Sequence, residues 1–160
     1  MLRVGALGLA VATAVDGVEL HAADIDPAAV ACARANVARV GGHAYSGDLF
    51  EPLPEALRGR VDVLLANVPY VPSEAIALMP PEARLHEARV ALDGGADGLD
   101  VARRVIDASP LWLASGGSLL FETSEDQASP AVAAVTAAGL QARLVTDDER
   151  GATVVVGTNG

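Results

Sequence analysis

Residues 61–76, VDVLLANVPYVPSEAI, set the architecture of this chain. Their first part is a nearly continuous apolar run, which is typical of a strand buried on both faces in a parallel sheet. The run ends in a carboxamide, followed by two prolines and a tyrosine. Such an ending is either a plain turn or the edge of a binding site. The elements on either side of it are needed to distinguish the two.

Upstream of this segment, the pattern predicts a strand, a helix and a second strand. The first strand is expected over residues 18–23. The helix begins with Asp26 as its cap and Pro27 at its first position, a strong start signal, and Gly41 ends it. A second strand is expected over residues 43–46. The order strand, helix, strand indicates a parallel pair.

Downstream, helices and strands continue to alternate. The expected elements are a helix over residues 98–108, a strand over 118–123, a helix over 128–138, and strands over 141–146 and 153–157. An acidic turn joins the last two strands, which predicts an antiparallel hairpin at the C-terminal end. The whole pattern predicts an α/β protein with a mostly parallel, doubly wound sheet, forming one domain over residues 1–160.

Composition excludes several classes of function. The net charge is −10 at pH 7, which argues against non-specific binding to nucleic acid. No apolar run approaches the roughly 20 residues that span a bilayer. The first fifteen residues resemble a secretory signal without a clear cleavage site, so we expect a cytoplasmic protein. The three histidines lack metal-ligand spacing and predict no metal site, and Cys32 is expected in the core.

Two acidic residues follow predicted strands, at the sheet edge where ligands bind in this fold class. Asp24 could accept hydrogen bonds from a ribose diol, or it could belong to a helix-capping run with Asp26. Asp48 could accept from an adenine amine, with Leu49 or Phe50 against the ring, or it could be an ordinary turn residue. Each residue alone leaves both interpretations open.

Asn67, at the end of a third strand, offers a donor and an acceptor to a planar amide. Pro69 forces Val68 into an extended conformation, which can aim the carbonyls of residues 67 and 68 at one point. Tyr70 adds an aromatic face. A site of this kind works by positioning and electrostatics, without a general base. Alone, the tetrapeptide also fits a turn; beside two acidic strand ends it predicts an amide-binding site.

Together these segments resemble the HemK-type class I methyltransferases, which transfer a methyl group from S-adenosylmethionine to a glutamine amide of translation release factors. ADIDPAAVACARANV (23–37) is similar to that family's ribose-binding segment, and GDLFEPLP (47–54) to its adenine-side loop. Residues 67–100 are similar to its substrate motif and the loop that follows. The resemblance implies a Rossmann-like sheet, S-adenosyl-L-methionine as cofactor, and a protein substrate such as a release factor.

The resemblance also implies roles for individual residues. The implied cofactor-binding residues are Gly5, Asp24, Ile25, Asp48, Leu49 and Asn67. The residues implied to position the substrate amide are Asn67, Val68, Pro69 and Tyr70. The family motif is Asn-Pro-Pro-Tyr, and here Val68 replaces its first proline. Because the backbone carbonyl at this position faces the amide, we expect the change to be tolerated.

The sequence departs from the family at its start. The family has a first strand that ends in a loop with three alternate glycines; Gly5 matches the third, and Met1 and Arg3 stand in place of the others. The first strand, central in this fold, and an N-terminal helical domain have no counterpart. We therefore hypothesise an N-terminally shortened chain. Its sheet would have two unpaired edges through which it could form a homo-oligomer, and cofactor binding would be weak.

Three other functions compete with glutamine methylation. Amino-methyltransferases of nucleic acid use similar motifs, although the acidic charge weighs against this activity. A remnant without catalytic activity could act as a binding or oligomerising module through its sheet edges. A hydride-transfer dehydrogenase shares the acidic strand end but leaves residues 67–70 without a role.

Overall fold

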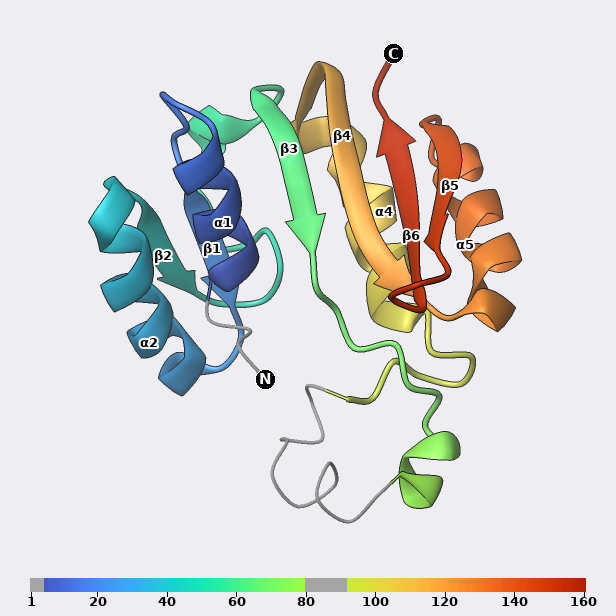
Figure 1. Ribbon diagram of the computed structural model, residues 1–160. Helices are drawn as coiled ribbons and strands as arrows, with labels where there is room; N and C mark the ends of the chain where they lie inside the picture. The colour runs from blue at the N-terminus through green and yellow to red at the C-terminus, as the bar shows by residue number, and fades with distance from the viewer. Residues whose placement is uncertain (1–4, 80–91) are drawn as a thin grey trace. The chain divides into compact units, whose positions relative to one another are not determined.

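The computed structural model describes residues 5–79 and 92–160. The chain divides into two compact units, Met1–Leu57 and Arg58–Gly160, and Figure 1 shows their elements. In chain order these are α1 (Ala6–Ala14), β1 (His21–Asp24), α2 (Pro27–Val37), β2 (His43–Ser46), β3 (Val61–Ala66), α4 (Asp100–Trp112), β4 (Leu113–Thr123), α5 (Glu125–Ala137), β5 (Gln141–Asp147) and β6 (Ala152–Thr158). That all of residues 1–160 form a single catalytic domain stays a prediction.

In the first unit, β1 and β2 form a parallel pair connected by α2. The Asp26 side chain caps α2 by accepting a hydrogen bond from the Ala28 backbone N–H at 2.9 Å, as the sequence predicts. The helix buries Val30, Ala33 and Val37 and packs on both strands. Cys32 is exposed, so the prediction that it lies in the core is wrong. It lies on the exposed side of α2, away from the buried stripe.

The second unit contains a four-stranded sheet in the order β3-β4-β6-β5. β3 and β4 are parallel, while β6 runs antiparallel to both β4 and β5, so the predicted C-terminal hairpin is confirmed. Helices α4 and α5 contact each other and lie against the same face of this sheet (Figure 1). Their core contains Ile106, Leu119, Val135 and Val155, each at most 1% exposed.

β3 is an edge strand, and this corrects the expectation that it is buried on both faces. Within the described part of the chain it pairs only with β4. Val63, in its middle, is 51% exposed. An apolar run therefore predicted the strand correctly but overestimated its burial, because burial depends on neighbours that the run itself does not specify.

β4 begins at Leu113, five residues before the expected start at residue 118, and therefore contains Gly116 and Gly117. Leu113 pairs with Val61, and the register shifts before Ser118 pairs with Val63. A Cβ atom on Gly117 would lie 2.5 Å from the Val61 carbonyl oxygen, so only glycine fits this irregular stretch.

α4 extends past its expected end, through Pro110 to Trp112. A proline inside a helix cannot donate to the carbonyl four residues earlier, which here belongs to Ile106. The Ser109 hydroxyl donates to that carbonyl at 2.8 Å. This side-chain contact replaces the missing backbone hydrogen bond, so the helix continues.

No hydrogen-bonded ladder joins the two sheets among residues 5–79 and 92–160. No helix in the described part of the chain is long and apolar enough to cross a membrane.

Candidate functional site

In the first unit, the end of β1 and the loop after β2 lie side by side. Asp24 pairs in register with Ser46, and the Gly47 N–H donates to the Asp24 carbonyl at 3.1 Å. The Asp24 side chain accepts from the Asp26 N–H through Oδ1 at 2.9 Å. Within the described residues its Oδ2 has no donor. The structure thus brings Asp24 next to the segment that contains Asp48, and leaves one Asp24 carboxylate oxygen available to a ligand.

The loop after β2 has an unusual backbone. Leu49 has φ +48°, the only positive φ of a non-glycine residue in the described ranges. This conformation costs about 1–3 kcal/mol and is often retained where a site requires it. Hydrogen bonds from the Glu51 N–H to the Asp48 carbonyl (3.0 Å) and from the Leu53 N–H to the Phe50 carbonyl (3.0 Å) hold it. The adenine-side role of Asp48 and Leu49 remains a prediction.

A small hollow of about 20 Å³ opens beside these strand ends. Its lining residues are Gly5, Ala22, Ala23, Asp24, Val30, Ala33, Ala44 and Tyr45. A space of this size admits a water-sized group and not a nucleoside. A ribose would therefore have to lie over the strand ends, near Asp24 and the 53% exposed side chain of Ile25.

Gly5 directly precedes α1 with φ +74°, and a Cβ atom there would lie 3.1 Å from Val37 Cγ1 of α2. A glycine at this position is thus favoured by its backbone conformation, and a larger residue would also crowd Val37. The free oxygen of the Asp24 carboxylate suits a ribose diol, because a carboxylate oxygen can accept hydrogen bonds from two hydroxyl groups. Met1 and Arg3 lie outside the described residues.

In the second unit, β3 leads into the segment with Asn67, Val68 and Tyr70. The Asn67 side chain is exposed, and none of its polar atoms has a partner within residues 5–79 and 92–160. Val68, by contrast, is only 9% exposed. The Asn67 carboxamide therefore faces solvent, while the neighbouring Val68 is buried in the protein.

This segment is bonded along its length to residues 92–95. The Val71 N–H donates to the Leu92 carbonyl at 3.2 Å, and the Gly94 N–H donates to the Val71 carbonyl at 2.9 Å. The Ser73 hydroxyl donates to Asp93 Oδ1 at 2.6 Å. The glycine-rich sequence DGGADGLD (93–100) therefore supports the loop that contains residues 71–73. Residues 80–91 of the family-like segment, including His86, lie outside the described ranges.

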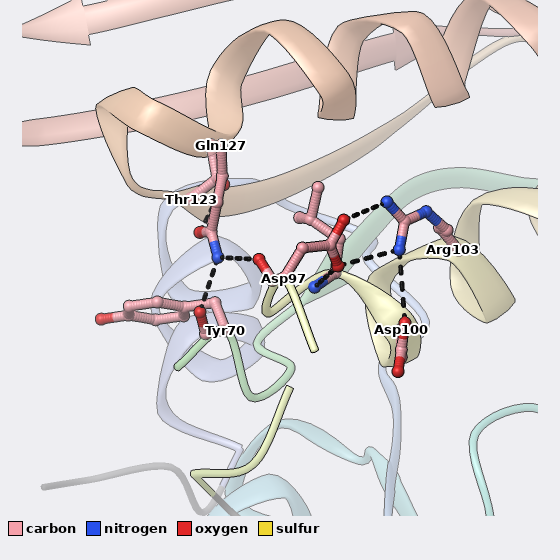
Figure 2. A network of polar contacts seen from close by, with 7 residues as sticks. Tyr70, Asp97, Asp100, Arg103, Thr123 and Gln127 are labelled. Atoms are coloured by element: carbon pink, nitrogen blue, oxygen red, sulfur yellow. Dashed lines mark hydrogen bonds and ion pairs between the residues drawn. The ribbon is translucent and has the colours of Figure 1, made fainter. Parts of the chain in front are cut away.

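Gly98 lies close to both Tyr70 and Gln127. It has φ +80°, and a Cβ atom there would lie 2.3 Å from the Tyr70 carbonyl oxygen and 2.1 Å from Gln127 Nε2. Gln127, near the start of α5, donates to the Tyr70 carbonyl at 2.8 Å (Figure 2). Glycine is thus the residue that lets three segments meet at the end of the substrate motif.

Asp97, next to Gly98, forms a two-pronged ion pair with Arg103 of α4 (Figure 2). One of its contacts joins Arg103 Nη1 to Asp97 Oδ1 at 2.9 Å. The hydrogen bond from Arg103, helped by one from the Leu99 N–H, lowers the pKa of Asp97 from 3.8 to about 2. Both side chains are more than one third exposed, so solvent weakens the pair. The pair joins the Asp97 side chain to α4.

Sequence reasoning missed Gln127, Asp97 and Gly98 as parts of this site. The available signal was local: Ser124 and Gln127 form a capping box at the start of α5. That pattern explains Ser124 but does not reveal a partner far away in sequence. Because Asp24 and Asp48 belong to one unit and Asn67 to the other, their grouping into one site stays a prediction.

No cluster in the described residues could hold a metal ion.

Comparison with known families agrees with these features. A family model described as "Methyltransferase small domain" matches residues 4–111. The release factor glutamine methyltransferase of Gloeobacter violaceus is 42% identical over 127 residues, which cover 77% of this chain and 43% of that protein. The one of Geobacter sulfurreducens is 34% identical over 155 residues, covering 96% of this chain and 54% of that protein.

A third relative is the ribosomal protein uL3 glutamine methyltransferase of Burkholderia pseudomallei, 37% identical over 133 residues, covering 78% of this chain and 43% of that protein. The chain thus spans about half the length of the curated relatives it matches. The resemblance to HemK-type enzymes is confirmed at the level of sequence.

Solved structures confirm the fold. A methyltransferase from Pyrococcus furiosus has a TM-score of 0.67 at 12% identity and covers 97% of this chain and 70% of its own. A ribosomal protein L11 methylase from Lactobacillus delbrueckii subsp. bulgaricus has a TM-score of 0.65 at 13% identity, covering 98% of this chain and 66% of its own. The predicted Rossmann-like fold of class I methyltransferases is therefore confirmed. The chain belongs to the methyltransferase small domain family, and its matched sequence relatives are protein glutamine methyltransferases.

Proposed function

We propose that this chain is the catalytic part of an S-adenosylmethionine-dependent methyltransferase that methylates a glutamine side-chain amide of a protein. The observation that carries this proposal is the Asn67 carboxamide, exposed and without a partner in the described chain, on a loop fixed by the hydrogen bonds of Val71 and Ser73. A flat amide substrate needs a donor and an acceptor at a fixed distance, and a carboxamide provides both.

S-adenosylmethionine, when bound, would supply an electrophilic methyl group; its methyl–sulfur bond would break as the amide nitrogen takes the methyl group, and S-adenosylhomocysteine would be the leaving group. The residues that would hold it are Gly5, Asp24, Ile25, Asp48, Leu49 and Asn67. The Asp24 carboxylate accepts from the ribose hydroxyls through its free oxygen. Leu49, and the exposed Ile25 side chain, offer apolar contacts to the adenine.

The chain's own contribution to the reaction is positioning. The Asn67 side chain and the Val68 carbonyl hold the N–H groups of the substrate amide, and Tyr70 packs on its plane. Acceptors at those N–H groups fix the orientation of the amide and raise the electron density on its nitrogen. Orientation and electrostatic stabilisation of this kind lower the barrier without a general base, and the nitrogen proton leaves to solvent.

The names of the relatives point to two protein substrates. Most of those cited are named for release factors and one for ribosomal protein uL3. We infer a release factor as the substrate, and a cytoplasmic location, since translation takes place there. A homo-oligomer formed through the edges of β1 and β3 remains a further part of the proposal; each strand pairs on one side only within the described chain.

Radiolabelled methyl transfer tests the proposal. The protein is incubated with labelled S-adenosylmethionine and, in separate reactions, a release factor, ribosomal protein uL3 and an oligonucleotide. We expect label on a glutamine of the release factor, and at least a 100-fold loss of kcat in Asn67→Ala, because a misplaced amide costs about that much. The control is Gln141→Ala, which removes an exposed carboxamide from β5.

Three results would contradict the proposal. Label on the oligonucleotide alone would indicate a nucleic-acid amino-methyltransferase. No label on any substrate, together with no binding of the cofactor, would favour a binding module without catalytic activity. Equal activity of Asn67→Ala and Gln141→Ala would remove the proposed role of Asn67.

A further inference from the structure

The Gln127 side chain makes more contacts than a helix cap requires. Its Nε2 donates to the Tyr70 carbonyl and to the Asp97 carbonyl, both at 2.8 Å (Figure 2). Its Oε1 accepts from the Thr123 hydroxyl at 3.1 Å and from the Ser124 hydroxyl at 3.0 Å. The residue is only 6% exposed. A buried carboxamide with all its polar atoms bonded is rigid, because losing any one contact leaves an unsatisfied group.

The two halves of this carboxamide serve different purposes. The capping box needs only the oxygen, which accepts from the Ser124 backbone N–H at 3.2 Å. A glutamate would provide that oxygen equally well and would suit the start of a helix electrostatically. Only a glutamine adds two donors, and both reach carbonyls outside α5. The donors are therefore not explained by capping.

Those donors fix two loops against each other. Tyr70 ends the substrate motif, and Asp97 belongs to the glycine-rich segment, where its side chain pairs with Arg103 and its carbonyl accepts from Gln127. Fixing the Tyr70 carbonyl limits rotation of the chain just after Pro69, whose own φ is set by its ring. The Pro69 ring and the hydrogen bond to the Tyr70 carbonyl together limit the directions in which the carbonyls of residues 67 and 68 can point.

We propose that Gln127 is a positioning residue for the substrate amide, acting through the Tyr70 backbone. This inference rests on the proposed function for the identity of the substrate, and on the hydrogen bonds above for the positioning itself. Gln127 does not touch substrate or cofactor in this scheme; it keeps residues 67–70 in the geometry that methyl transfer needs.

Two variants separate positioning from helix capping. Gln127→Glu keeps an oxygen for the cap but replaces both donors with a carboxylate oxygen facing two carbonyls. Ser124→Ala removes the cap hydroxyl and leaves the Gln127 donors in place. We expect Gln127→Glu to lower kcat at least 10-fold, with the cofactor dissociation constant changed less than 2-fold. We expect Ser124→Ala to lower Tm by about 2–4 °C with kcat changed less than 2-fold.

Hydrogen exchange supplies a readout that does not depend on activity. The amides of Val71 and Ser73 donate to the Leu92 and Gly95 carbonyls. We expect their exchange to accelerate at least 10-fold in folded Gln127→Glu and to stay unchanged in Ser124→Ala. Unchanged exchange in Gln127→Glu, or an equal loss of kcat in both variants, would overturn the inference. Faster exchange in a protein that methylates no glutamine would refute the proposed function and leave the positioning role in place.

Discussion

Replacing Gly98 by alanine is the most direct test of how closely the three segments around Tyr70 are packed. The new Cβ atom would lie 2.3 Å from the Tyr70 carbonyl oxygen and 2.1 Å from Gln127 Nε2. The Gln127 side chain cannot easily move aside, because its nitrogen is bonded to two carbonyls. Either the backbone of the substrate motif shifts or the hydrogen bonds break.

The magnitude follows from two separate costs. A left-handed backbone at φ +80° destabilises the fold by about 1–2 kcal/mol when the residue is not glycine. Crowding of a well-packed site adds about 1–3 kcal/mol. Gly98→Ala should therefore lower the free energy of unfolding by about 2–5 kcal/mol, a large share of the stability of an average domain.

Gly139→Ala is the matched control. Gly139 follows α5 with φ +85°, and a Cβ atom there would meet nothing within 4 Å. This variant should lose only the backbone contribution, about 1–2 kcal/mol of the free energy of unfolding. Urea unfolding followed by circular dichroism gives both values. Equal destabilisation of Gly98→Ala and Gly139→Ala would refute the reasoning, since it would mean that the contact with Tyr70 costs nothing.

Two further predictions concern carboxylates. Because the pKa of Asp97 is about 2 when folded and near 3.8 otherwise, its pair with Arg103 stabilises the fold above about pH 4, and this contribution disappears as the pH falls through 2. Asp97→Asn should therefore be less stable than the wild type at pH 6, by under about 1 kcal/mol for so exposed a pair, and the difference should shrink as the pH falls to 2 and vanish below it, as measured by urea unfolding. Asp24→Asn should weaken S-adenosylmethionine binding at least 10-fold in calorimetry, whereas Asp26→Asn should not, because asparagine also caps a helix.

In the first unit, β1, α2 and β2 could be predicted because their signals are local, whereas the helix α1 was not predicted. Asp26 and Pro27 specify where α2 begins, and the buried stripe from Val30 to Val37 specifies which face packs. These signals act over a few residues and need no knowledge of the rest of the fold. The same holds for the C-terminal hairpin, whose strands are joined by one short acidic turn.

Features that depend on distant partners could not be predicted. The early start of β4 requires Leu113 to pair with Val61, and nothing near Leu113 in the sequence indicates this. The exposure of Val63 depends on which strands lie beside β3. In the candidate site, Asn67 and Tyr70 stand out by composition, but Gln127 is 57 residues away from Tyr70 and lies within an ordinary capping pattern.

The long sequence separation between Tyr70 and Gln127 also has a consequence for how the protein matures. During synthesis, residues 67–70 leave the ribosome well before α5 exists, and contacts between distant segments form late in folding. A nascent chain that has completed β3 thus lacks the contacts that hold its substrate loop. Under the proposed function, the geometry that would hold a substrate amide is therefore complete only after β4 and α5 have assembled.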